Sequence, residues 1–172
     1  MIHEPLPQTV NTWSGFRLIP GPKAFFARLR QDQTGIQGAV AFLTLTAAFS
    51  AGAGLLAYKA GFRPAAFGVL FANAVGMCVL AVVVGFSVMV MCFGGKTTLK
   101  TMFKIYAFST GATLIFSWIP SSLWFTEPWK WWLIYTGLTG AAGLTRKEAG
   151  LVVLLSIAVI FLFFQSLIAI MS

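Results

Sequence analysis

Long apolar stretches without a single charge alternate along this chain with short segments that carry Lys and Arg. The uncharged stretches cover residues 33–58, 64–95, 105–126, 131–145 and 149–172. Because a helix needs about 20 mostly apolar residues to cross the hydrocarbon core of a bilayer, this pattern predicts an all-α, polytopic membrane protein. We expect five transmembrane helices, at about residues 35–58, 65–93, 105–123, 128–144 and 149–171, in a single domain that covers residues 1–172.

The starts of the last two predicted helices rest on local signals. Thr126-Glu127-Pro128 is typical of a helix start, with the proline in the first helical position. A helix over residues 128–144 would be about 25 Å long, just enough to cross. The fifth helix is predicted to begin with a capping box, in which Thr145 is the N-cap and Glu148 lies three residues later.

The composition supports lipid as the solvent of this chain. Of the 172 residues, 58% are hydrophobic and 9% are charged, whereas about 25% of the residues in soluble domains are charged. The formal net charge is +8. In a soluble protein this charge would indicate nucleic acid as a partner. Here the basic residues lie between apolar stretches, so we expect membrane lipids with anionic headgroups as the partner, and no nucleic acid.

The distribution of Lys and Arg predicts the orientation of the helices. The N-terminal segment, the second connection and the fourth connection carry four, three and two of them, nine in all, against three on the other side. Positive residues stay in the cytoplasm. We therefore expect residues 1–34 in the cytoplasm and the C-terminus outside. Five of the six tryptophans surround the third connection, at positions 118, 124, 129, 131 and 132, as in an aromatic belt at the outer interface.

The stretch Gly94-Gly95-Lys96-Thr97-Thr98 resembles the end of a nucleotide-binding phosphate loop. That loop needs another glycine five residues before the second one, and the residue there is Val90. The preceding segment is also an apolar span and not a strand. The sequence therefore excludes this kind of nucleotide site, and Gly94 and Gly95 are predicted to end the second span, because glycine readily adopts a positive φ.

The lysines after the two glycines predict a short amphipathic helix. Lys96, Lys100 and Lys104 recur every four residues and share one side of a helix, while the opposite side carries Leu99, Met102 and Phe103. We expect this helix to lie in the cytoplasmic headgroup layer, with the lysines as candidate headgroup or partner contacts. The alternative is a plain stop-transfer cluster that only enforces topology.

The N-terminal segment repeats this arrangement before the first span. Pro22 can start a helix, and Phe25, Phe26 and Leu29 share one face of it. A short interfacial helix is predicted, with a disordered tail as the alternative. Its candidate headgroup or partner contacts are Lys23, Arg28 and Arg30.

The residues needed for catalysis or metal binding are scarce. The only histidine is His3, and the acidic residues Glu4, Asp32, Glu127 and Glu148 lie at the predicted span ends. Ion-coupled transporters normally place ionisable groups inside their spans, where this chain is predicted to have none. We therefore predict no catalytic site, no metal site, no cofactor and no enzymatic activity.

Two amide side chains lie inside the predicted spans. Asn73 and Gln165 are costly to expose to hydrocarbon, so each should face another helix or a partner. Hydrogen bonding between helices is the expected role, and ligand binding is the alternative.

The order of these features resembles the Yip1 family of five-span membrane proteins. The resemblance runs from about Ile19 to Phe161 and is carried by "PKAFF", "FGGKTTLKTMFKIYAFS" and "TRKEA". Its motif positions are Pro22, Phe25, Phe26, Gly94, Gly95, Pro120 and Gly143. One departure is Gly111, where the family often has a proline nearby. The resemblance implies the membrane fold of a compact prokaryotic-type member, placed in the inner (plasma) membrane, more firmly than it implies the Rab GTPase binding of eukaryotic members.

Three functions remain open on the sequence alone. The first is a non-enzymatic scaffold or accessory subunit that organises membrane partners or lipids, with other membrane proteins or a second copy of the chain as partner. The second is a transporter, channel or lipid-moving protein with an uncharged polar pathway through Asn73, Gln165 and hydroxyl side chains. The third, by analogy with the family, is a vesicle-trafficking adaptor.

Overall fold

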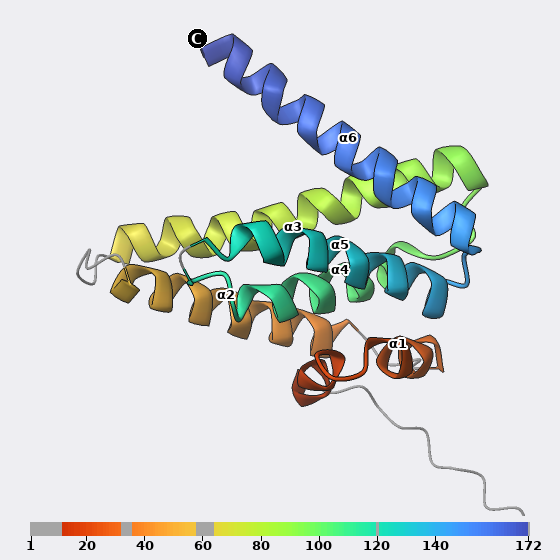
Figure 1. Cartoon of the computed structure of the whole chain (residues 1–172), viewed down its shortest axis with the longest axis horizontal. Helices are drawn as coiled ribbons and strands as arrows, with labels where there is room; N and C mark the ends of the chain where they lie inside the picture. Colours follow the sequence, from red (N-terminus) through yellow and green to blue (C-terminus); the bar gives the residue numbers. More distant parts are fainter. Residues whose placement is uncertain (1–11, 32–35, 58–63, 120, 172) are drawn as a thin grey trace, which may run out of the picture.

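The computed structural model describes residues 12–31, 36–57, 64–119 and 121–171, and this part of the chain is helical without any strand. A short 3-10 helix precedes six α-helices (Figure 1). Their bounds are η1 Thr12–Leu18, α1 Pro22–Gln31, α2 Gln37–Ala57, α3 Pro64–Phe93, α4 Leu99–Leu114, α5 Leu123–Gly140 and α6 Arg146–Met171. The helices α2 to α5 lie side by side and alternate in direction, and α6 leaves the bundle at an angle (Figure 1). His3, Glu4 and Asp32 lie outside the described residues.

Three of the described helices are long and apolar enough to cross a membrane. They span Gln37–Leu56, Pro64–Phe93 and Arg146–Ser166, which correspond to the first, second and fifth predicted spans. The all-helical membrane fold is therefore confirmed. The predicted third and fourth spans correspond to α4 and α5, which fall short of that length or hydropathy, so the count of five spans stays a prediction.

The helix α4 occupies the centre of the bundle, packed by α2, α3, α5 and η1. Every residue from Lys104 to Thr113 is buried. Such a helix does not face lipid, so its polar residues are tolerated, and this explains why its hydropathy is modest. With 16 residues it is about 24 Å long.

Two helix starts differ from the sequence prediction. The lysine-faced segment is not a separate helix, because α4 runs without a break from Leu99 to Leu114 and Lys96 lies before it. Its apolar side is only partly covered by protein, because Met102 is fully buried whereas Leu99 is 49% exposed. The fourth helix begins at Leu123 and not at Pro128, which lies inside α5. Ser121, with a φ of 68°, turns the chain just before this start.

One predicted turn and one predicted cap are confirmed. Gly94 and Gly95 follow the end of α3 with φ values of 70° and 77°, a conformation that favours glycine. At the start of α6, the backbone N–H of Thr145 donates to Glu148 Oε2 at 3.0 Å. The backbone N–H of Glu148 donates back to Thr145 Oγ1 at 3.4 Å, which completes the capping box.

The short helix α1 begins at Pro22, as predicted, but its apolar face packs on protein and not on lipid. Phe25, Phe26 and Leu29 are all buried, and α1 packs against α5. Gly140 of α5 permits the approach, because a Cβ there would lie 3.1 Å from Cβ of Phe26. The interfacial face predicted from the sequence is therefore part of the hydrophobic core.

The last helix, α6, packs on α3 and α5 only along its first half. Ala149, Val152 and Ser156 are fully buried there, on one face of the helix. Beyond Ile160 the helix stands clear of the bundle (Figure 1). The consecutive residues 161–164 are 60%, 63%, 49% and 38% exposed. Because successive residues point about 100° apart, no face of this turn is covered.

Candidate functional site

A cleft of about 460 Å³ opens between α2, α3, α4 and α5. It lies toward the end of the bundle where α4 ends and α5 begins, opposite the glycine turn after α3. Apolar side chains form part of its wall, among them Leu70, Met77 and Trp118. The remaining wall is polar, with side chains supplied by each of the four helices and by the connection after α4: Ser50, Asn73, Thr110, Thr113, Ser117, Thr126, Glu127 and Lys130.

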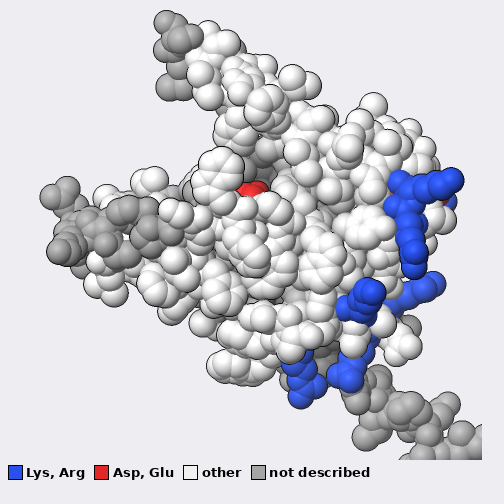
Figure 2. Space-filling view, in the orientation of Figure 1, with Lys and Arg blue, Asp and Glu red and all other residues white. Residues whose placement is uncertain are grey.

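One ion pair lies in this cleft. Lys130 Nζ donates to Glu127 Oε1 at 2.7 Å, one turn apart on α5, and Lys130 Nζ also lies 5.5 Å from the centroid of the Trp131 ring. The side chain of Lys130 is 18% exposed and that of Glu127 is 50% exposed. Figure 2 shows atoms of an acidic residue in a hollow whose immediate surroundings are uncharged, away from the Lys and Arg side chains. The two charges are opposite, so this ion pair adds no net charge to the cleft.

The hydroxyl groups of the cleft donate their protons to the protein itself. Thr113 Oγ1 donates to the Thr110 carbonyl at 2.9 Å, and Thr126 Oγ1 donates to the Ser122 carbonyl at 3.0 Å. Ser117 Oγ donates to the Leu114 carbonyl at 2.9 Å.

The last of these hydroxyls belongs to α2. The Ser50 and Ser117 oxygens lie 2.5 Å apart, and either hydroxyl can be the donor. With the Ser117 proton on the Leu114 carbonyl, Ser50 donates to Ser117. A hydroxyl carries two acceptor lone pairs besides its proton. The cleft therefore presents these four hydroxyls as hydrogen-bond acceptors.

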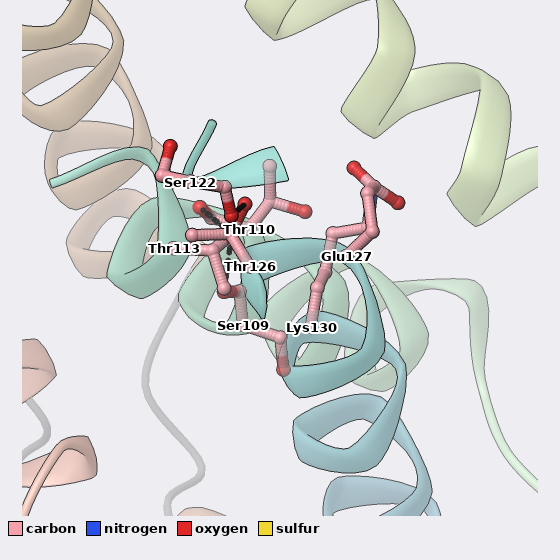
Figure 3. A network of polar contacts seen from close by, with 7 residues as sticks. All are labelled: Ser109, Thr110, Thr113, Ser122, Thr126, Glu127 and Lys130. Carbon is pink, nitrogen blue, oxygen red and sulfur yellow. Dashed lines mark hydrogen bonds and ion pairs between the residues drawn. The ribbon is translucent and has the colours of Figure 1, made fainter. Parts of the chain in front are cut away.

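Threonines of α4 and α5 meet beside this cleft (Figure 3). The buried hydroxyls of Ser109 and Ser122, in the same group of residues, have no hydrogen-bond partner among the described atoms. Most buried polar atoms in folded proteins are satisfied. The polarity at this junction is thus higher than the packing of two helices requires.

Asn73 was predicted as a polar contact from the sequence, whereas Glu127 and Lys130 were not predicted as site residues. Glu127 was expected ahead of the fourth helix, because Pro128 is typical of a first helical residue. The signal that could have found them is Ser121-Ser122 before Leu-Trp-Phe, since serine is a favoured helix N-cap, although the Ser122 side chain makes no capping hydrogen bond here. With that start, Glu127 lies in the second turn of α5 and Lys130 at the start of the third.

Apart from Lys130, most of the described basic residues gather at the opposite end of the molecule. Figure 2 shows the visible Lys and Arg side chains at one end only. Three segments meet there. The segment after α3 reaches the start of α6 through the ion pair of Lys96 with Glu148, and Gly143 lies beside the guanidinium of Arg30 on α1. The charge count predicted this grouping of the N-terminal segment with the second and fourth connections.

The predicted headgroup contacts fall into two groups. Lys23, Arg28, Arg30, Lys96 and Lys100 are exposed at this end. Lys104 is only 5% exposed, packed within α4, and so does not lie on an exposed lysine face. Contact of any of these residues with lipid headgroups stays a prediction.

The two amide residues lie in different surroundings. Asn73 lines the cleft together with hydroxyl side chains of the other helices. Gln165 is exposed on the projecting half of α6. The structure thus does not bring these two residues together. For Gln165, contact with a partner outside this chain stays a prediction.

The described residues offer few side chains that could bind a metal ion. Among the described residues no three His, Cys, Asp or Glu side chains come together as a possible metal site. Cys78 is buried, Cys92 is exposed, and both are free thiols.

The fold and its turns can be compared with known proteins. The family model described as the Yip1 domain matches residues 16–168, nearly the whole chain. The chain belongs to the Yip1 family. No curated protein and no solved structure matches this Yip1 protein.

The motif positions of the Yip1 resemblance have clear structural roles. Pro22 starts α1, and Phe25 and Phe26 anchor it in the core. The glycines at 94, 95 and 143 all adopt a positive φ, near 70°. Pro120 lies outside the described residues. The described motif positions build the fold of the Yip1 domain, and none of these described positions lines the polar cleft.

Proposed function

We propose that this protein is a non-enzymatic membrane scaffold or accessory subunit, which organises partner membrane proteins and lipids. The Yip1 family is not known as a family of enzymes, which agrees with this assignment. The single observation that carries the proposal is the projecting half of α6, where residues 161–164 are 38–63% exposed and Gln165 is exposed as well.

The physical argument concerns the amide of Gln165. Apolar side chains such as Leu162 are stable in contact with lipid tails, so the exposed apolar surface of α6 alone needs no protein partner. An amide in hydrocarbon lacks hydrogen-bond partners, and polar side chains in membrane helices hydrogen-bond across to another helix. The proposed partner is therefore a transmembrane helix of another membrane protein with a polar group opposite Gln165.

We further propose that all five long helices cross the membrane, with the basic end in the cytoplasm and the C-terminus outside. Helices α4 and α5 can cross although they are short, because α4 is enclosed by its neighbours and needs no continuous apolar surface. The inner membrane of a prokaryote is the proposed location. The exposed cations at the basic end would then face the anionic headgroups of the cytoplasmic leaflet.

Site-specific photo-crosslinking tests the scaffold proposal. A crosslinker placed at Leu162, on the projecting half of α6, should trap a membrane protein in native membranes. The matched control is Val152, on the same helix but fully buried. Gln165→Leu should weaken the adduct at Leu162. A protein that is found only as a free monomer in mild detergent, without any adduct at Leu162, contradicts the scaffold proposal.

The polar cleft supports a second candidate function. Ser50, Asn73 and Thr113 come from three helices and line one cavity, as expected of a protein that moves lipids or small solutes along a polar pathway. Flux in proteoliposomes that Asn73→Leu abolishes would support this function. Absence of flux for lipids and small solutes would leave it without support.

A further inference from the structure

We infer that the polar cleft binds the phosphoethanolamine headgroup, a zwitterion with a primary ammonium and a phosphate group. The inference deepens the lipid part of the proposed function, and it rests on that function in one respect: the beginning of α5 must lie at a headgroup layer. Binding in the cleft requires neither transport nor a partner at α6.

The hydrogen-bonding groups of the cleft select a donor. Thr113 and Thr126 offer only acceptor lone pairs, because their protons go to backbone carbonyls. The Ser50 and Ser117 hydroxyls share a hydrogen bond and add further acceptor lone pairs. Glu127 adds a half-exposed carboxylate. A primary ammonium supplies three N–H donors for such acceptors, as a lysine ammonium does. A quaternary ammonium, as in phosphocholine, supplies none.

The charges of the cleft select a zwitterion. Lys130 pairs with Glu127 at 2.7 Å, so a purely cationic or purely anionic ligand would leave one of the two charges without compensation. The ammonium of phosphoethanolamine can approach the Glu127 carboxylate while the phosphate approaches Lys130. Asn73 lines the same cleft and provides two further amide donors for the phosphate.

The opening of the cleft suits a lipid. Leu70 and Trp118, which line it, are 42% and 39% exposed, so the cavity opens between apolar side chains. Glu127 lies four residues after the start of α5, about 6 Å along the helix. The headgroup would enter at this end of the bundle while its acyl chains follow the exposed apolar surface.

Lipid retention in mixed nanodiscs tests the inference. The full-length protein is reconstituted with equal amounts of phosphatidylethanolamine and phosphatidylcholine with identical acyl chains, and the retained lipids are counted by native mass spectrometry. We expect phosphatidylethanolamine to be retained about three- to tenfold over phosphatidylcholine, the range of one hydrogen bond of ordinary net strength. Equal retention of the two lipids overturns the inference.

Three variants locate the binding. Glu127→Gln removes the carboxylate charge and should abolish the preference. Thr126→Val should reduce it, whereas Thr136→Val should not, although both threonines are buried on α5 and donate to the carbonyl four residues earlier. A preference that survives both Glu127→Gln and Thr126→Val contradicts the inference. Thermal stability is measured for each variant, and Thr126→Val keeps the test decisive if Glu127→Gln does not fold.

A soluble ligand would share the same chemistry. Free phosphoethanolamine is therefore added to the nanodiscs. Displacement of the lipid at similar concentration identifies a soluble source, and resistance to displacement identifies the lipid. Labelling of a cysteine at the exposed Trp124 shows separately whether this end reaches the outer surface. If it does and the lipid preference is still absent, the headgroup inference is refuted while the proposed orientation stands.

Discussion

Tyr106 of α4 lies with its hydroxyl group directly against the backbone of Gly85 in α3. A Cβ built on Gly85 would overlap the Tyr106 hydroxyl oxygen, so only glycine fits at this crossing. Tyr106 is fully buried, among the largest fully buried side chains of the chain. The close approach of α3 to the central helix therefore depends on this one missing side chain.

The substitution Gly85→Ala should lower the stability of the bundle. Overpacking of a well-packed core costs about 1–3 kcal/mol, which for a chain of this size corresponds to a fall of several degrees in the midpoint of thermal unfolding. The matched control is Gly76→Ala on the same helix, where a Cβ meets no atom within 4 Å. A detergent thermal-shift assay compares the two. Equal midpoints for both variants would contradict the packing argument.

Hydrophobic stretches predicted most of the fold because they report on lipid contact. The first, second and fifth predicted spans start within three residues of α2, α3 and α6. The enclosed helices were harder to place. Lys104 is buried in α4. The sequence pattern predicts it at the end of an interfacial helix. Where protein surrounds a helix on all sides, its sequence shows no periodic pattern that reports on its surroundings.

The candidate site was only partly predictable for a related reason. Asn73 was identified because an amide in an apolar stretch is unusual in any fold. Its neighbours Glu127 and Lys130 could be found only with the correct start of α5. Because Pro128 is predicted as the first helical residue, the predicted start is five residues too late. The convergence of four helices on one cleft depends on tertiary packing, which no local pattern contains.

Docking of α1 on α5 depends on the ring of Phe26. The substitution Phe26→Ala should cost about 3–5 kcal/mol, because it removes a fully buried ring. We expect the N-terminal segment to detach and trypsin to cleave faster at Arg28 and Arg30. Lys23→Ala, an exposed change on the same helix, is the control. Unchanged cleavage in Phe26→Ala would show that α1 is held by other contacts.

The capping box at the start of α6 separates two interactions of Glu148. Thr145→Ala removes the N-cap hydroxyl and should cost about 0.5–2 kcal/mol. Glu148→Gln keeps the capping box, since glutamine serves in that position, and removes only the ion pair with Lys96.

The second variant should therefore lose less stability than the first, and the loss should vanish at high salt because salt screens exposed ion pairs. Thermal unfolding of both variants at low and high salt measures the difference. A loss in Glu148→Gln that persists at high salt would mean that the carboxylate has another role.

The crossing of α4 can be tested with two cysteines at its opposite ends. In a Cys92→Ala background, with Cys78 left buried, we introduce Lys100→Cys at the basic end or Trp124→Cys beyond the end of α4. Trp124 is 89% exposed. If all five helices cross, a membrane-impermeant maleimide should label Trp124→Cys in intact cells and Lys100→Cys only after permeabilisation. Labelling of both from one side would show that α4 does not cross, and the reverse pattern would keep five crossings but invert the orientation. Because nine Lys and Arg residues lie in the N-terminal segment and the second and fourth connections, against three on the other side, the positive-inside rule favours the first outcome.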